Sequence, residues 1–206
     1  DGSVKIDEVL AESNETLFPV KNKEWMYLKV CSGQRKHVDP THLEPKIFHL
    51  PNNDEMIEWF MPHTGEPKVM IFAEKAGMLQ NFTGLKNPVE CRATGRIRLI
   101  NAIKMFLGNV GITVQGVQIE MDGIIAQEGH IINVEVKVNA NGKFLRKKQL
   151  FLSYKYNKSR FPDKNVYSVL INYNSKRETY YLQKIVFTSD DIDSMKIVKE
   201  AAYKIS

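Results

Sequence analysis

Residues 117–138 read VQIEMDGIIAQEGHIINVEVKV, and this stretch decides the fold that we expect. Apolar and polar residues alternate on both sides of a central Gln-Glu-Gly-His segment, with the period of two that is typical of half-buried β-strands. The glycine and its polar neighbours are typical of a turn. The stretch therefore predicts a hairpin with one apolar face, to which Ile119, Met121, Ile132 and Val134 belong.

The opposite face of this hairpin carries charged residues where an apolar sheet needs none. Asp122, Glu135 and Lys137 are expected to converge at one end of the sheet. Two carboxylates can hold a hard divalent cation, and a neighbouring ammonium can orient a water or stabilise an anion. That combination suits phosphodiester hydrolysis. The alternative is an exposed Glu–Lys pair, with Asp122 opening a turn before Gly123; it does not explain the convergence of three charged residues.

Composition indicates an ordinary globular chain. The 206 residues are 43% hydrophobic and 26% charged, which is enough to build a buried core. No apolar run approaches the length of a membrane span, and the polar start is unlike a signal peptide. Cys31 and Cys91 fit neither a disulfide framework nor zinc spacing, so we expect reduced thiols and a cytoplasmic protein. The absence of an initiator Met is compatible with a processed chain or a fragment of a larger protein.

The net charge of +5 is distributed unevenly. Between residues 137 and 188 there are twelve Lys or Arg and two acidic residues, a local charge of +10. A basic block after a carboxylate pair favours a polyanionic partner, although a solvated charged face is the plainer interpretation. The residues expected to bind nucleic acid are Lys143, Arg146, Lys147, Lys148, Lys158 and Arg160.

The remaining pattern predicts an α/β fold with a mixed central sheet flanked by helices, preceded by an α+β portion. In residues 85–206 we expect helices over 87–107, 143–156 and 189–202 and strands over 165–173 and 179–187. The helix over 143–156 places Gln149 on its inward stripe. Residues 1–84 are either a recognition or dimerisation part or a decoration of the catalytic domain. In them we expect helices over 5–11 and 54–60 and strands over 24–30 and 68–73.

The spacing Asp122, twelve residues, then Glu135-Val136-Lys137 resembles the motif of the PD-(D/E)xK nuclease superfamily, whose fold is restriction-endonuclease-like. The resemblance covers residues 88–187, although Met121 stands in place of the motif's Pro. It also includes the following helix, where many members carry a Gln in the position of Gln149. It implies catalytic roles for Asp122, Glu135, Lys137 and Gln149.

The same resemblance implies a Mg²⁺ ion bound by Asp122, Glu135 and the Val136 carbonyl, with Mn²⁺ as a substitute. Glu90 and Glu120 are candidates for an additional acid. The expected function is a Mg²⁺-dependent endonuclease that cuts double-stranded DNA, most like a homodimeric type II restriction enzyme. The alternatives are a structure-specific repair, recombination or defence nuclease, and a non-catalytic nucleic-acid-binding protein.

Overall fold

The computed structural model of the chain describes residues 15–21, 24–29, 35–36, 43–49, 65–99, 101–107, 110–139 and 145–205. Its centre is a seven-stranded mixed sheet in the order β4-β13-β12-β11-β9-β8-β5. These strands span Lys46–Phe48 (β4), Arg92–Arg98 (β5), Gln118–Gln127 (β8), His130–Val138 (β9), Asn165–Asn174 (β11), Thr179–Phe187 (β12) and Met195–Ile205 (β13).

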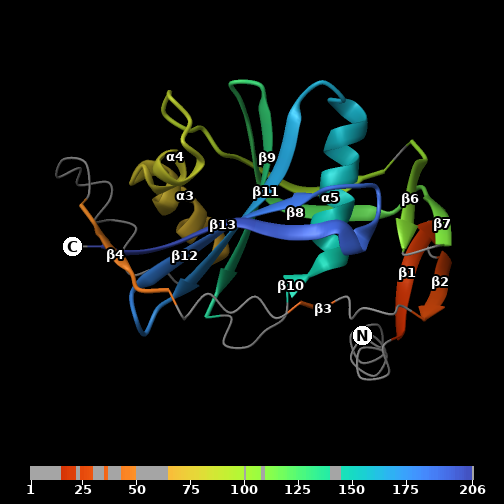
Figure 1. Cartoon of the computed structure of the whole chain (residues 1–206), viewed down its shortest axis with the longest axis horizontal. Helices are drawn as coiled ribbons and strands as arrows, with labels where there is room; N and C mark the ends of the chain where they lie inside the picture. The colour runs from red at the N-terminus through yellow and green to blue at the C-terminus, as the bar shows by residue number, and fades with distance from the viewer. Residues whose placement is uncertain are drawn as a thin grey trace.

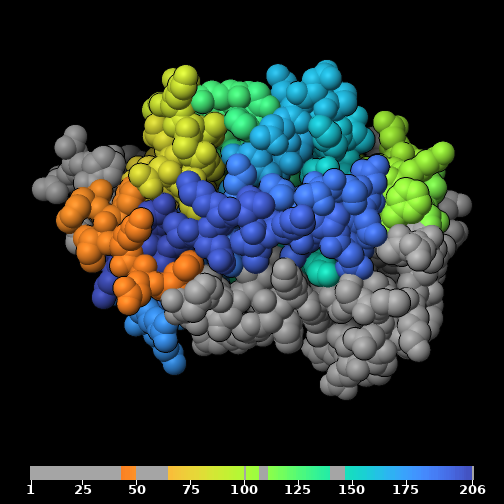
Figure 2. Space-filling model, viewed as in Figure 1, coloured from red at the N-terminus to blue at the C-terminus, as the bar shows by residue number. Residues whose placement is uncertain are grey.

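Helices cover both faces of this sheet (Figure 1). Helices α3 (Glu66–Lys75) and α4 (Met78–Thr83) lie on one face, and α5 (Lys147–Arg160) lies on the other. In the space-filling view, β13 crosses the visible face below these helices, and the β8–β9 turn emerges between α3–α4 and α5 (Figure 2). The architecture is therefore the expected mixed α/β fold.

Smaller pairs of strands complete the described structure. They are β1 (Glu15–Lys21) with β2 (Glu24–Lys29), β3 (Arg35–Lys36) with β10 (Leu145–Arg146), and β6 (Ile103–Leu107) with β7 (Val110–Val114). A short 3₁₀ helix, η1 (Ile192–Ser194), precedes β13.

The hairpin that the sequence predicts is present, with β8 and β9 antiparallel. Its predicted single apolar face is wrong: Ile119 and Met121 pack with α5, whereas Ile132 and Val134 pack with α3 and α4 on the other side of the sheet. Glu128 and Gly129 form its turn with φ values of 49° and 78°, as a two-residue turn between right-twisted strands requires. Strand β9 then pairs in parallel with β11, and α5 makes the crossover between them. All six residues from 131 to 136 are buried, because β9 is central and covered on both faces. A charged residue on β9 is therefore placed inside the protein.

Two hydrophobic clusters fill the layers on either side of the sheet. Phe72, Met78 and Phe82 of α3 and α4 pack against strands β9, β11 and β12. On the opposite face, Leu150 and Phe151 of α5 pack against β8, β11 and β12. Residues 66–83 thus share a core with the strands that follow residue 84.

Three predicted elements are wrong. The predicted helix over 87–107 is instead a loop followed by β5 and β6, the predicted strand over 68–73 is helix α3, and the predicted helix over 189–202 is η1 and β13. The strand predicted over 24–30 is confirmed as β2, and the two strands predicted over 165–173 and 179–187 as β11 and β12. The helix predicted over 143–156 is present as α5, shifted four residues. The helices predicted over 5–11 and 54–60 lie outside the described residues.

Candidate active site

The ladder between β8 and β9 ends at the pair Gly123↔Val134. Beyond it, Oδ2 of Asp122 accepts a hydrogen bond of 2.7 Å from the backbone N–H of Val136. The Asp122 carboxylate therefore accepts a hydrogen bond from β9 that a backbone carbonyl of β8 would accept if the ladder continued. Burial raises the pKa of Asp122, although this hydrogen bond and the charge of Lys137 act against that shift.

Gly123 allows the chain to pass close to helix α3 directly after Asp122. A Cβ at this position would lie 2.5 Å from Sγ of Cys91 and 2.6 Å from Sδ of Met70. Contacts this short require the neighbours to move. The glycine after Asp122 is therefore explained by packing rather than by a turn.

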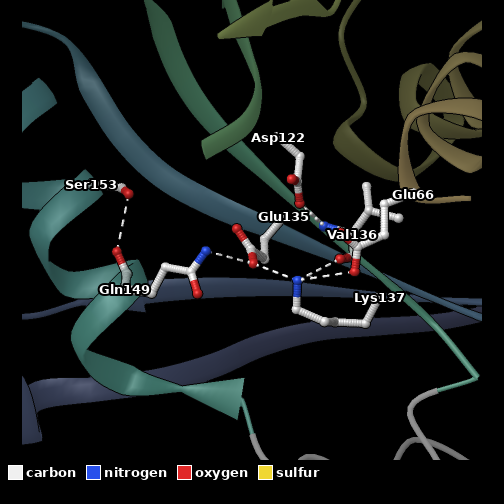
Figure 3. A network of polar contacts seen from close by, with 7 residues as sticks. All are labelled: Glu66, Asp122, Glu135, Val136, Lys137, Gln149 and Ser153. Carbon is white, nitrogen blue, oxygen red and sulfur yellow. Dashed lines mark hydrogen bonds and ion pairs between the residues drawn. The ribbon is translucent and has the colours of Figure 1, made fainter. Parts of the chain in front are cut away.

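Glu135 is the most deeply buried charged residue of the site, with 3% of its surface exposed. Its Oε1 accepts a hydrogen bond of 2.8 Å from Nε2 of Gln149 and lies 2.7 Å from Nζ of Lys137 (Figure 3). Burial raises the pKa of Glu135 to about 7, with Asp122 adding to the increase and Lys137 opposing it. The sheet therefore holds a carboxylate whose charge is only partly compensated.

Lys137 connects the site to the N-terminal half of the chain. Its Nζ lies 2.7 Å from the carbonyl oxygen of Val136 and 3.3 Å from Oε1 of Glu66, in addition to Glu135. Burial disfavours the charged form of Lys137, but the carboxylates of Glu135, Glu66 and Asp122 outweigh burial and raise its pKa. The ammonium therefore stays charged among three acids.

Glu66 was missed by sequence analysis. It is the first residue of α3 and stands 71 positions before Lys137. The signal that was available is Gly65-Glu66-Pro67, an acid and a proline at a helix start, followed by buried apolar residues at helical spacing. Interpreting residues 68–73 as a strand hid this helix start.

Helix α5 is fixed against β9 at two points along one of its faces. Gln149 contacts Glu135, and two turns later Nδ2 of Asn157 donates a 2.5 Å hydrogen bond to Oδ1 of Asn133. Asn133 in turn contacts Oγ of Ser168 at 3.4 Å. These buried amides satisfy one another and set the position of Gln149.

The other predicted residues are placed differently. Glu90 lies in the loop before β5, 3.5 Å from Arg92, and Glu120 forms an ion pair with Arg96. Glu120 is close enough to Asp122 to raise its pKa, whereas Glu90 acts on Glu74. The structure therefore places Glu120, but not Glu90, beside the candidate site.

The predicted nucleic-acid-binding residues that the structure describes lie at different places along α5. Lys147 is buried, with Nζ 2.9 Å from Oδ1 of Asp193, so it does not face a partner. Lys158 donates a hydrogen bond to the carbonyl of Pro162. Arg160 lies over the rings of Tyr156 and Phe161. It is at the far end of α5, about 16 Å along the helix from Gln149. Lys148 is partly exposed on α5. The side chains of Lys143 and Arg146 lie outside the described residues.

The donor set fits a hard cation that keeps several waters. Two carboxylates and the Val136 carbonyl are oxygen ligands of the kind that Mg²⁺ takes, and Glu135 is a buried carboxylate that a cation would stabilise. Within the described ranges, no group of three or more His, Cys, Asp or Glu side chains is arranged to hold a metal ion. Two carboxylates and one carbonyl would leave the other positions of a six-coordinate ion to water.

Comparison with known proteins identifies one family. No curated protein and no solved structure matches the chain. None of the described helices is both long and apolar enough to cross a membrane. A family model matches residues 35–204, which include the whole candidate site. The chain therefore belongs to the family described as Domain of unknown function (DUF6997).

Proposed function

We propose that the protein is a Mg²⁺-dependent endonuclease that hydrolyses phosphodiester bonds in double-stranded DNA. The observation that carries the proposal is the convergence of Asp122, Glu135 and Lys137 where β8 and β9 part, with Gln149 on Glu135. Twelve residues separate Asp122 from Glu135 in the chain, and the two lie on separate strands. A restriction-endonuclease-like fold and a homodimer with one site per DNA strand are part of this proposal.

Asp122, Glu135 and the Val136 carbonyl would hold the metal ion. When bound, Mg²⁺ supplies a water of lowered pKa and neutralises charge on the scissile phosphate, and Mn²⁺ is expected to substitute for it. The hydrogen bond from the Val136 N–H holds one oxygen of Asp122 in place. Gln149 does the same for Glu135 through Oε1, so both carboxylates are restrained before an ion binds.

Lys137 has the charge and position to serve the chemical step. Its ammonium lies 2.7 Å from Glu135, so it can donate a hydrogen bond to the attacking water or to a phosphate oxygen. The water oxygen bonds to phosphorus, the bond from phosphorus to the leaving oxygen breaks, and that oxygen takes up a proton. Negative charge grows on the phosphate oxygens as this happens, and a nearby ammonium stabilises it.

Glu66 acts as a positioning residue for Lys137 in this scheme. Its carboxylate lies 3.3 Å from Nζ, on the other side of the ammonium from Glu135 (Figure 3). With Glu135, it holds the long lysine side chain between two acids. Helix α3 therefore contributes to the site as well as to the core.

The test is incubation of the purified protein with supercoiled plasmid and with branched, flap and hairpin DNA, in Mg²⁺, Mn²⁺ or EDTA. Metal-dependent cleavage that Glu135→Gln abolishes supports the proposal. Discrete bands from plasmid indicate a restriction-type enzyme, and cleavage only at branches or ends indicates a structure-specific repair, recombination or defence nuclease. Binding without cleavage of any substrate in either metal would contradict the proposal and leave a non-catalytic DNA-binding protein.

A further inference from the structure

The ammonium of Lys137 is surrounded by as many acceptors as it has N–H groups. Its Nζ lies 2.7 Å from Oε1 of Glu135, 2.7 Å from the carbonyl oxygen of Val136 and 3.3 Å from Oε1 of Glu66 (Figure 3). A lysine ammonium has three hydrogens to donate, so these three oxygens can satisfy it completely. Strand β9 supplies the two closer oxygens, and the start of α3 supplies the third.

The two closer oxygens also belong to residues that would hold the metal ion. On Glu135, Oε1 accepts a hydrogen bond of 2.8 Å from Nε2 of Gln149 in addition to its contact with Lys137, so both of its lone pairs are engaged. A magnesium ion binds oxygen at about 2.0–2.1 Å, so an ion on Oε1 would lie within about 5 Å of Nζ. The ion and the ammonium therefore compete for the same oxygen.

Glu66 is the acceptor that a metal ion on Glu135 and Val136 would leave to Lys137. It is the first residue of α3, and its side chain is 42% exposed. Its distance of 3.3 Å is the longest of the three contacts, so it is the partner toward which Nζ can move closer. The stem of Lys137 is flexible and its side chain is 33% exposed, so the ammonium can make this movement without leaving the site.

We propose that Lys137 and the divalent cation compete for the oxygens of Glu135 and Val136, and that Glu66 favours the cation by holding the displaced ammonium. The proposal rests on the proposed nuclease function for its metal ion. It gives Glu66 a positioning role that depends on Lys137. Direct coordination of the ion is the other role that this acid can have, because its carboxylate offers the same kind of oxygen ligand.

The test measures Mn²⁺ binding by isothermal titration calorimetry at pH 8, without DNA. Lys137→Met keeps the length of the side chain but removes the ammonium, so it should bind Mn²⁺ about 10- to 100-fold more tightly than the wild type. That range corresponds to the loss of one competing hydrogen bond between charged groups. Lys137→Arg keeps the positive charge and should bind Mn²⁺ no more tightly than the wild type.

Glu66→Gln separates the two roles of Glu66 when it is measured with and without Lys137. If Glu66 holds the displaced ammonium, its loss should weaken Mn²⁺ binding about 10-fold when Lys137 is present. In the Lys137→Met background the same substitution should weaken binding less than about 3-fold, because no ammonium remains to be held. A direct ligand of the ion would be missed equally in both backgrounds.

The matched control is Lys68→Met, which removes the same charge from an exposed position on α3, two residues after Glu66. Because water and salt screen an exposed charge, this control should change Mn²⁺ affinity less than about 3-fold. Circular dichroism checks that each variant is folded. Lys137→Gln also removes the charge, and it takes the place of Lys137→Met if the methionine variant does not fold.

Equal Mn²⁺ affinities for wild type and Lys137→Met would overturn the proposal, as would an equal gain in the Lys68→Met control. Equal weakening by Glu66→Gln in both backgrounds would overturn its positioning role and make Glu66 a metal ligand. The binding assay needs no cleavage, so the two proposals fail in different ways. If wild type cleaves DNA and Lys137→Met gains no affinity, only the competition fails. If the affinities change as expected and no metal supports cleavage, only the nuclease assignment fails.

Discussion

Glu135→Gln tests whether the protein buries a carboxylate whose charge it does not fully stabilise. A bound cation would supply the missing stabilisation. The side chain is 3% exposed, and burial raises its pKa from about 4.5 to about 7. Glutamine has nearly the same shape, and its Oε1 can accept from Gln149 and Lys137. The substitution therefore removes the charge and little else.

The direction of the effect follows from the pKa. A carboxyl whose pKa is higher in the folded state keeps its proton between pH about 4.5 and 7, where the unfolded chain has lost it. The free energy of unfolding of the wild type therefore falls as pH rises through this window. The difference between the two pKa values corresponds to about 3 kcal/mol. Without metal, Glu135→Gln should match the wild type near pH 4.5 and exceed its stability by up to about 3 kcal/mol at pH 8.

For a chain of this length, that difference raises Tm by about 6–12 °C. The measurement is urea and thermal unfolding, followed by circular dichroism, in EDTA at pH 5 and pH 8. Mg²⁺ should then stabilise the wild type at pH 8 but not the variant, because the ligand is missing. Glu200→Gln, on an exposed position, controls for the loss of one charge. If Glu135→Gln is less stable than wild type at pH 8, the carboxylate is the stabilising half of a structural ion pair and the reasoning fails.

Three further substitutions separate chemistry from packing. Lys137→Ala should reduce cleavage about 100- to 1000-fold, because the ammonium serves the chemical step, while duplex binding in EDTA is retained. Cleavage at the wild-type rate would exclude Lys137 from the site. Gln149→Leu should lower turnover with little loss of Tm, since the amide serves Glu135, and a variant that melts early yet cleaves normally would make Gln149 structural. Gly123→Ala should cost about 1–3 kcal/mol in urea unfolding, because its Cβ meets Cys91 and Met70. Adding Cys91→Ala should recover part of this loss, and simple addition of the two losses would contradict the packing explanation.

The hairpin and its site are visible in the sequence because their signals are local. The alternation over 117–138 and the Glu128-Gly129 turn specify β8, β9 and their relative register. One further step of that register places Asp122 opposite Glu135, and Lys137 shares the face of Glu135 on β9. Gln149 follows because its helix is the crossover after β9.

The wrong predictions concern segments whose apolar residues fit both the helical period of about 3.6 residues and the strand period of two. In residues 87–107, Val89, Ala93 and Ile97 recur at helical spacing, yet residues 92–98 form β5 because their backbone pairs with the edge of β8. Residues 195–205 likewise complete the sheet as β13 by pairing with β12. A neighbouring strand supplies hydrogen bonds that local propensity does not encode.

The sequence alone determined the mixed α/β class, the central hairpin and three charged residues on one face, because these depend on periodicity within a single stretch of chain. Only the tertiary structure decided that Glu66 reaches Lys137 and that Lys147 turns inward to Asp193. Each of these depends on which distant element packs beside which. That choice minimises the exposed apolar surface of the whole chain, and no local pattern contains it.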